Sequence, residues 1–564
     1  MTGVRQIFRC IRRLSQISES GTKVANQFAR RTSTQARQKI IEDENGKKIF
    51  LSPFGEFTPT EMLVQEYIWR NTTKFANNIA LECSVTGRKY TYSEARDATN
   101  YIGRSLINMG LRKGDVVALI SPNYPEAILG TIGILEADLI VTTVNPTYTS
   151  DEIKRQLKIA NAKAVITVAE IAPIVLQASR DILASGGHLV VIEDGSGPIP
   201  DGTVPFKDLI ARGKTLPPIT SYQMSPNDLA VLPFSSGTTG LPKGVMLTHS
   251  NLVSNMQMVE QTCEEKMWQT TTADFQEVLP LILPFFHIFG LNGMVLPRIA
   301  CGAKLITVPK FTPELFISVL MKHKVRILSE YIFYLAEYVS GMISRVLYFI
   351  GDGSLHTCIT LSVVLKSFTS PVVTLDIGDS KPGSVGRNIV GCEVRLVDPS
   401  TKEDISEQGQ VGEIWVRGPH VMKGYLNNES ATNDMIVENG WLKTGDIAYY
   451  DEDSNFFITD RMKELIKVKG FQVPPAEMEA ILRSHPDIEE AAVIGLPDER
   501  CGEIPKAFVV TRKGSKVTEE DIKDFIKSKV SEYKQLRGGV TFINEIPKNA
   551  SGKILRSKLR NECI

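Results

Sequence analysis

Long hydrophobic runs, paired cysteines and clustered histidines are all missing from this sequence. No stretch of about 18 uninterrupted apolar residues occurs, which argues against a membrane-spanning helix. The nearest candidate, residues 279–300, contains three prolines, His287 and Arg298, and this pattern favours a buried pocket wall. The eight cysteines include no Cys-x-x-Cys pair. Neither a structural zinc site nor a secreted disulfide framework is therefore expected, and the thiols are predicted to be reduced and mostly buried.

A surplus of basic charge is also lacking, since 64 Lys and Arg balance 64 Asp and Glu. This balance argues against a nucleic-acid binder, which needs positive charge to neutralise phosphates. The balance is uneven along the chain: residues 1–40 hold nine basic groups against Glu19 alone. An Arg-rich, acid-poor start with spaced apolar residues predicts a mitochondrial presequence, with a disordered basic tail as the alternative.

The chain end bears on the same question of location. It reads Glu562-Cys563-Ile564 and lacks the Ser-Lys-Leu-like tripeptide of peroxisomal proteins. Mitochondrial localisation is therefore expected, with the cytoplasm as the alternative.

Alternation of short Val/Ile/Leu runs with helical patterns dominates the first part of the chain. Residues 116–121, 125–135 and 139–144 predict a strand, a helix and a second strand, and no repeat of solenoid length is visible. Further apolar strands are expected at 164–168, 189–192 and 229–234. A chain of 564 residues is too long for a single ordinary hydrophobic core. The alternation of strands and helices predicts a large α/β domain with mainly parallel sheets.

The predicted secondary structure changes after Gly412. Alternating strands at 413–417, 448–450 and 456–458 predict a small β-rich subdomain. Beyond residue 461 the pattern becomes α+β, with helices expected at 477–484 and 519–530 and strands near 491–494 and 507–511. The predicted organisation is a presequence at 1–40, a large N-terminal domain at 41–461 and a C-terminal domain at 462–564.

The most informative motif is a loop directly behind the apolar run 229–234. It reads Ser235-Ser236-Gly237-Thr238-Thr239-Gly240-Leu241-Pro242-Lys243-Gly244. Its glycines let backbone N–H groups approach an anion, and its hydroxyls and ammonium supply further donors. The spacing is not that of the Walker loop. A phosphate site is predicted, because a flexible surface linker would not explain a lysine and a proline at this place.

Three further polar motifs follow along the chain, each weak by itself. Thr444-Gly445-Asp446 places a carboxylate where it can accept hydrogen bonds from two vicinal hydroxyls. The segment 460–472 concentrates cations at a domain boundary, and 547–556 puts Lys553 on a Ser-Gly turn. Taken singly, these motifs are typical of a turn, a solvated charge run and a surface turn.

Together and in this order, the four motifs resemble the adenylate-forming acyl-CoA synthetase superfamily, in the branch of 4-coumarate:CoA ligase, firefly luciferase and fatty acyl-CoA synthetases. Residues 283–290, Leu-Pro-Phe-Phe-His-Ile-Phe-Gly, also resemble the aromatic motif beside the family's acyl pocket. The resemblance spans about residues 46 to 556 and implies an α/β fold. Its large N-terminal domain combines parallel α/β sheets with a small β-rich subdomain, and its small α+β C-terminal domain is mobile.

The resemblance implies a two-step ligase reaction with ATP, Mg²⁺ and CoA. A carboxylate attacks the α-phosphate of Mg-ATP to give an acyl-adenylate and pyrophosphate, and the thiol of CoA then displaces AMP. By the same resemblance, a fatty acid or related carboxylate is the expected substrate partner.

Different residues would act in the two steps. The loop would hold the β- and γ-phosphates, and Lys553 would stabilise the charge gathered between carboxylate and α-phosphate. Lys463 would be the hinge on which the C-terminal domain turns between the steps. The remaining implied roles are ribose binding by Asp446 and Arg461, the second-step face with Lys467, Gly470 and Gln472, and the acyl pocket wall with His287 and Phe289.

One family motif is absent. The Tyr-Gly-x-Thr-Glu segment, whose ring packs on adenine and whose glutamate binds magnesium, would precede Thr369, but residues 364–368 read Val-Leu-Lys-Ser-Phe. The segment 328–368 is atypical, and no metal ligand is nominated. Loss of one such electrostatic stabiliser costs on the order of 10² to 10³ in rate. A catalytically impaired pseudoenzyme or splice variant that still binds ligands is one alternative function, and a luciferase-like monooxygenase is another.

Overall fold

The computed structural model divides into two compact units. The first comprises Met1–Ile41, Phe50–Glu393 and Val416–Leu442, and the second comprises Glu42–Ile49, Val394–Trp415 and Lys443–Ile564. The structure describes residues 39–44, 46–184, 186–219, 224–235, 242–263, 270–323, 325, 373–374, 381, 384–461, 466–468, 471–473, 475–498, 500–530, 532–548 and 554–561. The atypical segment 328–368 and all of the expected presequence except residues 39–40 lie outside these residues.

A nine-stranded sheet is the centre of the first unit. Its order is β11-β12-β10-β6-β5-β7-β8-β9, with β19 paired to β12. The strands from β10 through β9 are parallel, whereas β12 runs antiparallel to β10, β11 and β19. The bounds are β5 Val116–Ile120, β6 Ile140–Val144, β7 Ala162–Val168, β8 His188–Ile192, β9 Val204–Pro205, β10 Leu229–Val231, β11 Phe234–Ser235, β12 Lys243–Thr248 and β19 Gly424–Tyr425.

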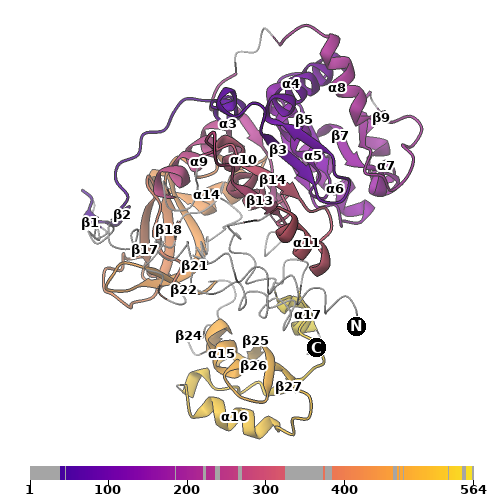
Figure 1. Cartoon of the computed structure of the whole chain (residues 1–564). Coiled ribbons are helices and arrows are strands. Elements are labelled where there is room, and N and C mark those ends of the chain that lie inside the picture. The colour runs from indigo at the N-terminus through magenta and orange to yellow at the C-terminus, as the bar shows by residue number, and fades with distance from the viewer. Residues whose placement is uncertain are drawn as a thin grey trace. The chain divides into compact units, whose positions relative to one another are not determined.

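Helices cover this sheet because its strands are apolar on both faces. Every residue of β5 and β6 is buried, as expected of a parallel sheet with covered faces. Helices α4 and α5 pack closely, and a Cβ on Gly133 would lie 2.5 Å from Cγ2 of Ile102. The helices are α4 Tyr92–Asn108, α5 Pro125–Glu136, α6 Ser150–Ala160, α7 Ala172–Leu183 and α8 Phe206–Thr215 (Figure 1).

A four-stranded sheet of order β13-β14-β3-β4 belongs to the same unit. Its strands are β3 Ile79–Cys83, β4 Lys89–Thr91, β13 Val278–Leu281 and β14 Lys304–Thr307. Between β13 and β14 the chain forms a buried π-helix, Phe289–Val295, and a short helix, α10 Leu296–Ala300. Helices α3 Val64–Trp69, α9 His249–Cys263, α11 Pro313–His323 and α14 Glu429–Met435 also belong to this unit. The apolar segment 279–300 is thus mostly buried, although Pro284 and His287 are exposed.

A seven-stranded sheet of order β1-β2-β17-β18-β21-β20, with β22 paired to β21, forms the predicted β-rich part. Strands β20, β21 and β22 are mutually antiparallel where they pair. The bounds are β1 Lys39–Glu42, β2 Lys48–Leu51, β17 Glu393–Val397, β18 Gly412–Arg417, β20 Ile436–Val437, β21 Trp441–Tyr450 and β22 Phe456–Arg461. A separate two-stranded pair joins β15 Val373–Thr374 and β16 Arg387–Asn388.

The C-terminal part of the second unit is an α+β fold around a five-stranded sheet, β24-β23-β26-β25, with β27 paired to β26. Ile466, Val493, Ala507 and Ile522 lie in its buried core. Helix α16 begins with a reciprocal cap between Thr518 and Asp521. The elements are β23 Ile466–Val468, β24 Phe471–Val473, α15 Pro475–Arg483, β25 Ile488–Asp498, β26 Gly502–Thr511, α16 Glu519–Lys527, β27 Val540–Phe542 and α17 Arg556–Asn561.

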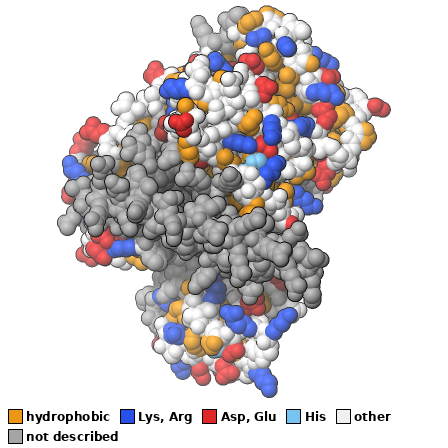
Figure 2. All heavy atoms as spheres, in the orientation of Figure 1, with side chains coloured by type: hydrophobic (Ala, Val, Ile, Leu, Met, Phe, Trp, Pro, Cys, Tyr) orange, Lys and Arg blue, Asp and Glu red, His pale blue; other side chains and the backbone are white. Residues whose placement is uncertain are grey.

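The predicted α/β class is confirmed, and each strand and helix named from the sequence falls on an observed element. None of the helices in the described ranges is long and apolar enough to cross a bilayer. Four cysteines in those ranges, Cys83, Cys301, Cys392 and Cys501, are buried free thiols, as expected. Basic and acidic side chains intermingle on the face shown in Figure 2, in keeping with the balanced charge.

Candidate functional site

The predicted phosphate loop is held between two paired strands. Ser235 at the end of β11 and Lys243 at the start of β12 are register partners, so the two ends of the loop lie side by side. Lys243 is half-buried, and its ammonium lies 5.3 Å from the centroid of the Tyr425 ring. The intervening residues Ser236, Gly237, Thr238, Thr239 and Gly240 lie outside the described residues.

Strand β12 is fixed from its other edge by the short strand β19. The N–H of Leu426 donates to the carbonyl of Gly244 at 2.8 Å, and the N–H of Lys423 donates to the carbonyl of Met246 at 2.9 Å. A Cβ at position 244 would lie 3.2 Å from Leu232 and 3.3 Å from Phe234. This tight packing explains the glycine beside Lys243.

Helix α9 starts directly after β12 with contacts that the sequence analysis missed. The N–H of Asn251 donates to Oγ1 of Thr248 at 3.1 Å, and Oδ1 of Asn251 accepts the N–H of Thr248 at 3.0 Å. Nδ2 of Asn251 also donates to the carbonyls of Pro419 and Val421. The Thr-x-x-Asn spacing is the signal that could have found this reciprocal cap.

The Thr-Gly-Asp motif lies within β21 of the second unit. Gly445 has a φ of +71°, and Asp446 is 3% exposed. Oγ1 of Thr444 accepts the N–H of Asp446 at 3.0 Å. Asp446 and Arg461 are register partners across the antiparallel pair β21 and β22, so the structure brings the backbones of these two predicted ribose-binding residues together.

The predicted second-step residues lie on a hairpin. Lys467 in β23 and Gln472 in β24 are register partners, and Gly470, between these strands, lies outside the described residues. The hairpin brings the backbones of Lys467 and Gln472 to one place, although they are separated in sequence. The hinge candidate Lys463 is also outside the described residues.

The turn predicted to carry Lys553 is closed at its base. Lys548 and Ile554 form an antiparallel bridge, and the N–H of Leu555 donates to the carbonyl of Pro547 at 2.8 Å. Residues 549–553, with Lys553 itself, lie outside the described residues. Arg556, which follows this turn, is also held in place, because its guanidinium donates to the carboxylate of Glu479 at 2.7 Å.

The aromatic motif at 283–290 forms the entrance to the π-helix. His287 is exposed, and its Nδ1 accepts the N–H of Phe289 at 3.3 Å, whereas Phe289 is 8% exposed. Asn123 donates to the carbonyls of Leu281 and Leu283 and fixes this segment beside the end of β5. Asn123 was not predicted. Because π-helical turns occur frequently at functional sites, the conformation agrees with a pocket wall.

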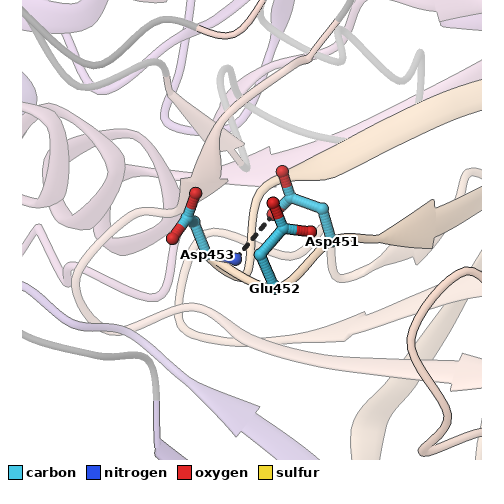
Figure 3. Close-up of side chains that lie close together, drawn as sticks. All are labelled: Asp451, Glu452 and Asp453. Atoms are coloured by element: carbon cyan, nitrogen blue, oxygen red, sulfur yellow. Dashed lines mark hydrogen bonds between the residues drawn. The ribbon is translucent and has the colours of Figure 1, made fainter.

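One carboxylate cluster in the described part of the chain invites a metal interpretation: Asp451, Glu452 and Asp453 in the turn after β21 (Figure 3). Oδ1 of Asp451 accepts the N–H groups of Asp453 at 3.0 Å and of Asn455 at 2.9 Å. Glu452 and Asp453 are exposed. These contacts build the turn, and exposed acidic groups such as these are common without a bound ion.

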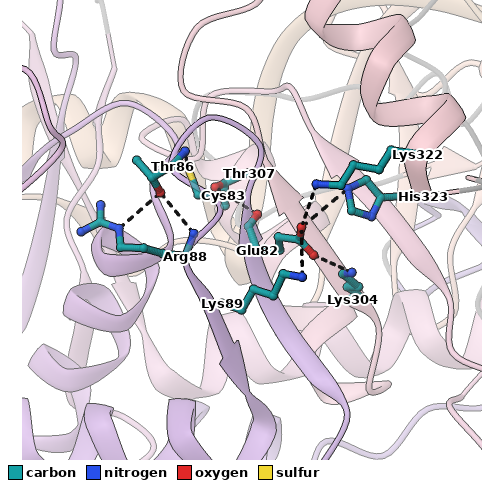
Figure 4. A network of polar contacts seen from close by, with 9 residues as sticks. All are labelled: Glu82, Cys83, Thr86, Arg88, Lys89, Lys304, Thr307, Lys322 and His323. Atoms are coloured by element: carbon teal, nitrogen blue, oxygen red, sulfur yellow. Dashed lines mark hydrogen bonds and ion pairs between the residues drawn. The ribbon is translucent and has the colours of Figure 1, made fainter.

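A second polar cluster surrounds the buried carboxylate of Glu82 in the first unit (Figure 4). Lys304 lies at 2.6 Å, Lys322 at 3.4 Å, Lys89 at 3.6 Å and Nε2 of His323 at 3.8 Å from its oxygens. Burial opposes ionisation, but the hydrogen bond and charge of Lys304 hold the pKa of Glu82 below its usual value. The cluster ties β3, β4, β14 and α11 together.

Comparison with known proteins agrees with the motifs. Residues 68–330 and 362–426 match the AMP-binding enzyme family, and residues 477–553 match the AMP-binding enzyme C-terminal domain. The chain is 35% identical to 4-coumarate–CoA ligase 1 of Arabidopsis thaliana over 568 residues, which cover 93% of this chain and 97% of the relative. It is 36% identical to 4-coumarate–CoA ligase 1 of Solanum tuberosum, with 92% and 97% covered.

Solved structures give the same result. The anthranilate CoA ligase AuaEII, in complex with anthranoyl-AMP, superposes with a TM-score of 0.76 at 26% identity and covers 90% of this chain and 98% of its own. The o-succinylbenzoate CoA synthetase of Bacillus subtilis, in complex with its acyl-adenylate, superposes with a TM-score of 0.72 at 25% identity, with 89% and 98% covered.

Proposed function

Because this chain belongs to the AMP-binding enzyme family, in the group of the 4-coumarate–CoA ligases, we propose that it is an ATP-dependent acid–thiol ligase. It joins a carboxylic acid to CoA through an acyl-adenylate and releases pyrophosphate and AMP. The observation that carries the proposal is the family match, which extends over both the AMP-binding and the C-terminal domain. The pairing of Asp446 with Arg461 supports a nucleotide site in the same chain.

The proposed chemistry divides between the two steps. In the first, Lys243 and its loop hold the outer phosphates, Asp446 and Arg461 hold the ribose, and Lys553 stabilises the charge between carboxylate and α-phosphate. In the second, the hairpin of Lys467 and Gln472 faces the acyl-adenylate while the CoA thiol attacks. Magnesium would arrive with ATP and supply charge neutralisation at the phosphates.

The proposed substrate is a fatty acid or a related carboxylate with an apolar body. The buried Phe289 and Phe285 of the aromatic motif support an apolar wall. The related proteins are named for aromatic acids such as 4-coumarate and anthranilate, so aryl carboxylates belong to the proposed class. The depth of the acyl pocket beside this wall would decide the preferred acyl chain length and whether an aromatic ring is accepted.

The test is ATP–pyrophosphate exchange with the full chain against a panel of fatty acids and hydroxycinnamates. We expect exchange with at least one acid and formation of its CoA thioester, detected by mass spectrometry. The absence of exchange with every acid, from a chain that is folded by circular dichroism, would overturn the ligase proposal.

A second candidate is a nucleotide-binding protein with impaired catalysis. It is favoured by one observation, the absence of the Tyr-Gly-x-Thr-Glu motif before residue 369. Calorimetry with ATP, combined with the exchange assay, separates the two candidates: the impaired protein would bind ATP without exchanging pyrophosphate, whereas the ligase does both.

A further inference from the structure

A buried hydrogen-bond network lies behind the Thr-Gly-Asp turn. We propose that Glu413 is a positioning residue that fixes this turn and thereby sets the carboxylate of Asp446 for the ribose hydroxyls of ATP. Glu413 has no role among the residues predicted from the sequence. The inference rests on the proposed function, because it assigns a means of nucleotide selectivity to the same site.

The carboxylate of Glu413 is shared between two donors. Its Oε1 accepts the N–H of Gly445 at 3.0 Å, and its Oε2 accepts the indole N–H of Trp415 at 2.8 Å. Glu413 and Trp415 are two residues apart on β18 and therefore point to the same face of the strand. Glu413 is 1% exposed, so water does not compete for these bonds.

Thr444 holds the turn from its other side. Its hydroxyl donates to the carbonyl of Ile414 at 2.6 Å and accepts the N–H of Asp446 at 3.0 Å. Two groups of the motif are thus bound to β18: the hydroxyl of Thr444 to the carbonyl of Ile414, and the N–H of Gly445 to the carboxylate of Glu413. Through the bond from Asp446 to Thr444, these two contacts hold the three residues of the motif.

The anchors matter because the turn itself is conformationally free. Gly445 has a φ of +71°, and no atom lies within 4 Å of the position where its Cβ would be. Glycine adopts many backbone conformations at little cost, so side-chain packing does not hold this one. The pairing of β21 with β18 and β22 and the hydrogen bonds to Glu413 and Ile414 hold it instead. A displaced Gly445 would carry Asp446 with it, and ribose recognition by two hydrogen bonds tolerates an error of only about 0.5 Å.

Glu413→Gln is the discriminating substitution. Glutamine keeps the size of the side chain but offers one acceptor oxygen and one NH2 group to two N–H donors, so one bond is lost. Glu403→Gln is the matched control, because Glu403 lies in the same unit, is exposed and undergoes the same change of charge.

The experiment measures binding of ATP and of 2′,3′-dideoxy-ATP to the full chain by calorimetry. We expect Glu413→Gln to weaken ATP binding about tenfold, the usual effect of one hydrogen bond, and to change dideoxy-ATP binding less than about twofold. Dideoxy-ATP lacks both ribose hydroxyls and makes no hydrogen bond to Asp446, so a displacement of Asp446 should not weaken its binding. Glu403→Gln should change neither affinity.

Equal weakening of both nucleotides, or no weakening of either, overturns the positioning role. If Glu413→Gln fails to fold, Trp415→Phe is the second variant, because it deletes the indole donor to Glu413 and keeps an aromatic ring. It should likewise weaken ATP binding, by about threefold, and leave dideoxy-ATP binding nearly unchanged. A failure of the unmodified chain to bind ATP at all overturns the proposed function, and that outcome is visible before any variant is compared.

Discussion

At the scale of single residues, an uncharged, buried imidazole joins the first residue of α9 to the first residue of α3. Nδ1 of His249 accepts the N–H of Val64 at 3.2 Å. Burial lowers the pKa of His249 to about 4, against the attraction of Asp228. In the unfolded chain the pKa returns to about 6.5, so the unfolded state binds a proton that the folded state excludes. The stability from the neutral imidazole is complete above about pH 6.5 and is lost as the pH falls toward 4.

We therefore expect His249→Gln to flatten the pH dependence of unfolding. In the unmodified chain this histidine should remove up to about 3 kcal/mol of unfolding free energy between pH 7 and pH 4. Glutamine offers an acceptor oxygen to Val64 but does not titrate. Urea unfolding at a series of pH values checks this, and identical slopes for the two proteins would contradict it.

Gly290 is a second residue whose identity is set by contact. A Cβ at this position would lie 2.3 Å from the carbonyl oxygen of Pro284 and 2.8 Å from Cα of Phe285. Gly290→Ala should therefore destabilise the chain by about 1–3 kcal/mol, because the backbone of the aromatic motif would have to move. Gly197→Ala is the control, since open space surrounds that position. Equal unfolding midpoints for the two variants would refute the argument.

Such residue-level constraints are only partly readable from sequence. The motif order predicted Asp446 and Arg461 as one group, and they are register partners. Glu413 was missed because its bond to Gly445 spans 32 residues and connects two strands whose pairing no local pattern specifies. Gly290 was named only as the last residue of the aromatic motif, because its contact with Pro284 arises from a chain reversal and not from a periodic element.

At the scale of elements, burial explains why strands were predicted well. The run Val116–Ile120 is apolar throughout and is covered on both faces, so its sequence alone identifies a parallel strand. The π-helix Phe289–Val295 was not predicted, because its apolar residues have the same composition as an α-helix and differ only in hydrogen-bond spacing. The Glu82 cluster was missed as well, since its members come from four separate elements.

That cluster yields a prediction about how the elements hold together. Glu82→Ala should destabilise the first unit by about 3–5 kcal/mol, because it leaves the 16%-exposed Lys304 without its partner at 2.6 Å. Lys322→Ala should cost less than about 1 kcal/mol, because that ammonium is 62% exposed. Urea unfolding of both variants is the measurement. Similar losses of unfolding free energy in the two variants would show that the buried carboxylate of Glu82 does not hold the cluster together.

At the scale of the whole molecule, the basic N-terminal segment predicts a mitochondrial location. Residues 1–40 carry a balance of +8, and the rest of the chain carries −8. A fluorescent protein fused to these 40 residues should enter mitochondria, because import requires a basic amphipathic segment. Replacement of Arg12 and Arg13 by Glu should abolish the import. A diffuse cytosolic signal from the unmodified fusion would contradict the prediction.

The two-step reaction makes a separable prediction for the C-terminal domain. Lys553 is proposed to act only where a carboxylate meets the α-phosphate, so Lys553→Ala should lower ATP–pyrophosphate exchange by at least about 10²-fold. It should leave the conversion of a presynthesised acyl-adenylate by CoA nearly unchanged, because the carboxylate is already activated. Lys467→Ala should give the opposite pattern. Both variants lie in segments of one domain, so a general loss of folding would impair the two half-reactions together. Each half-reaction measured by single turnover distinguishes these outcomes, and parallel losses in both variants would reject the division of labour between the two lysines.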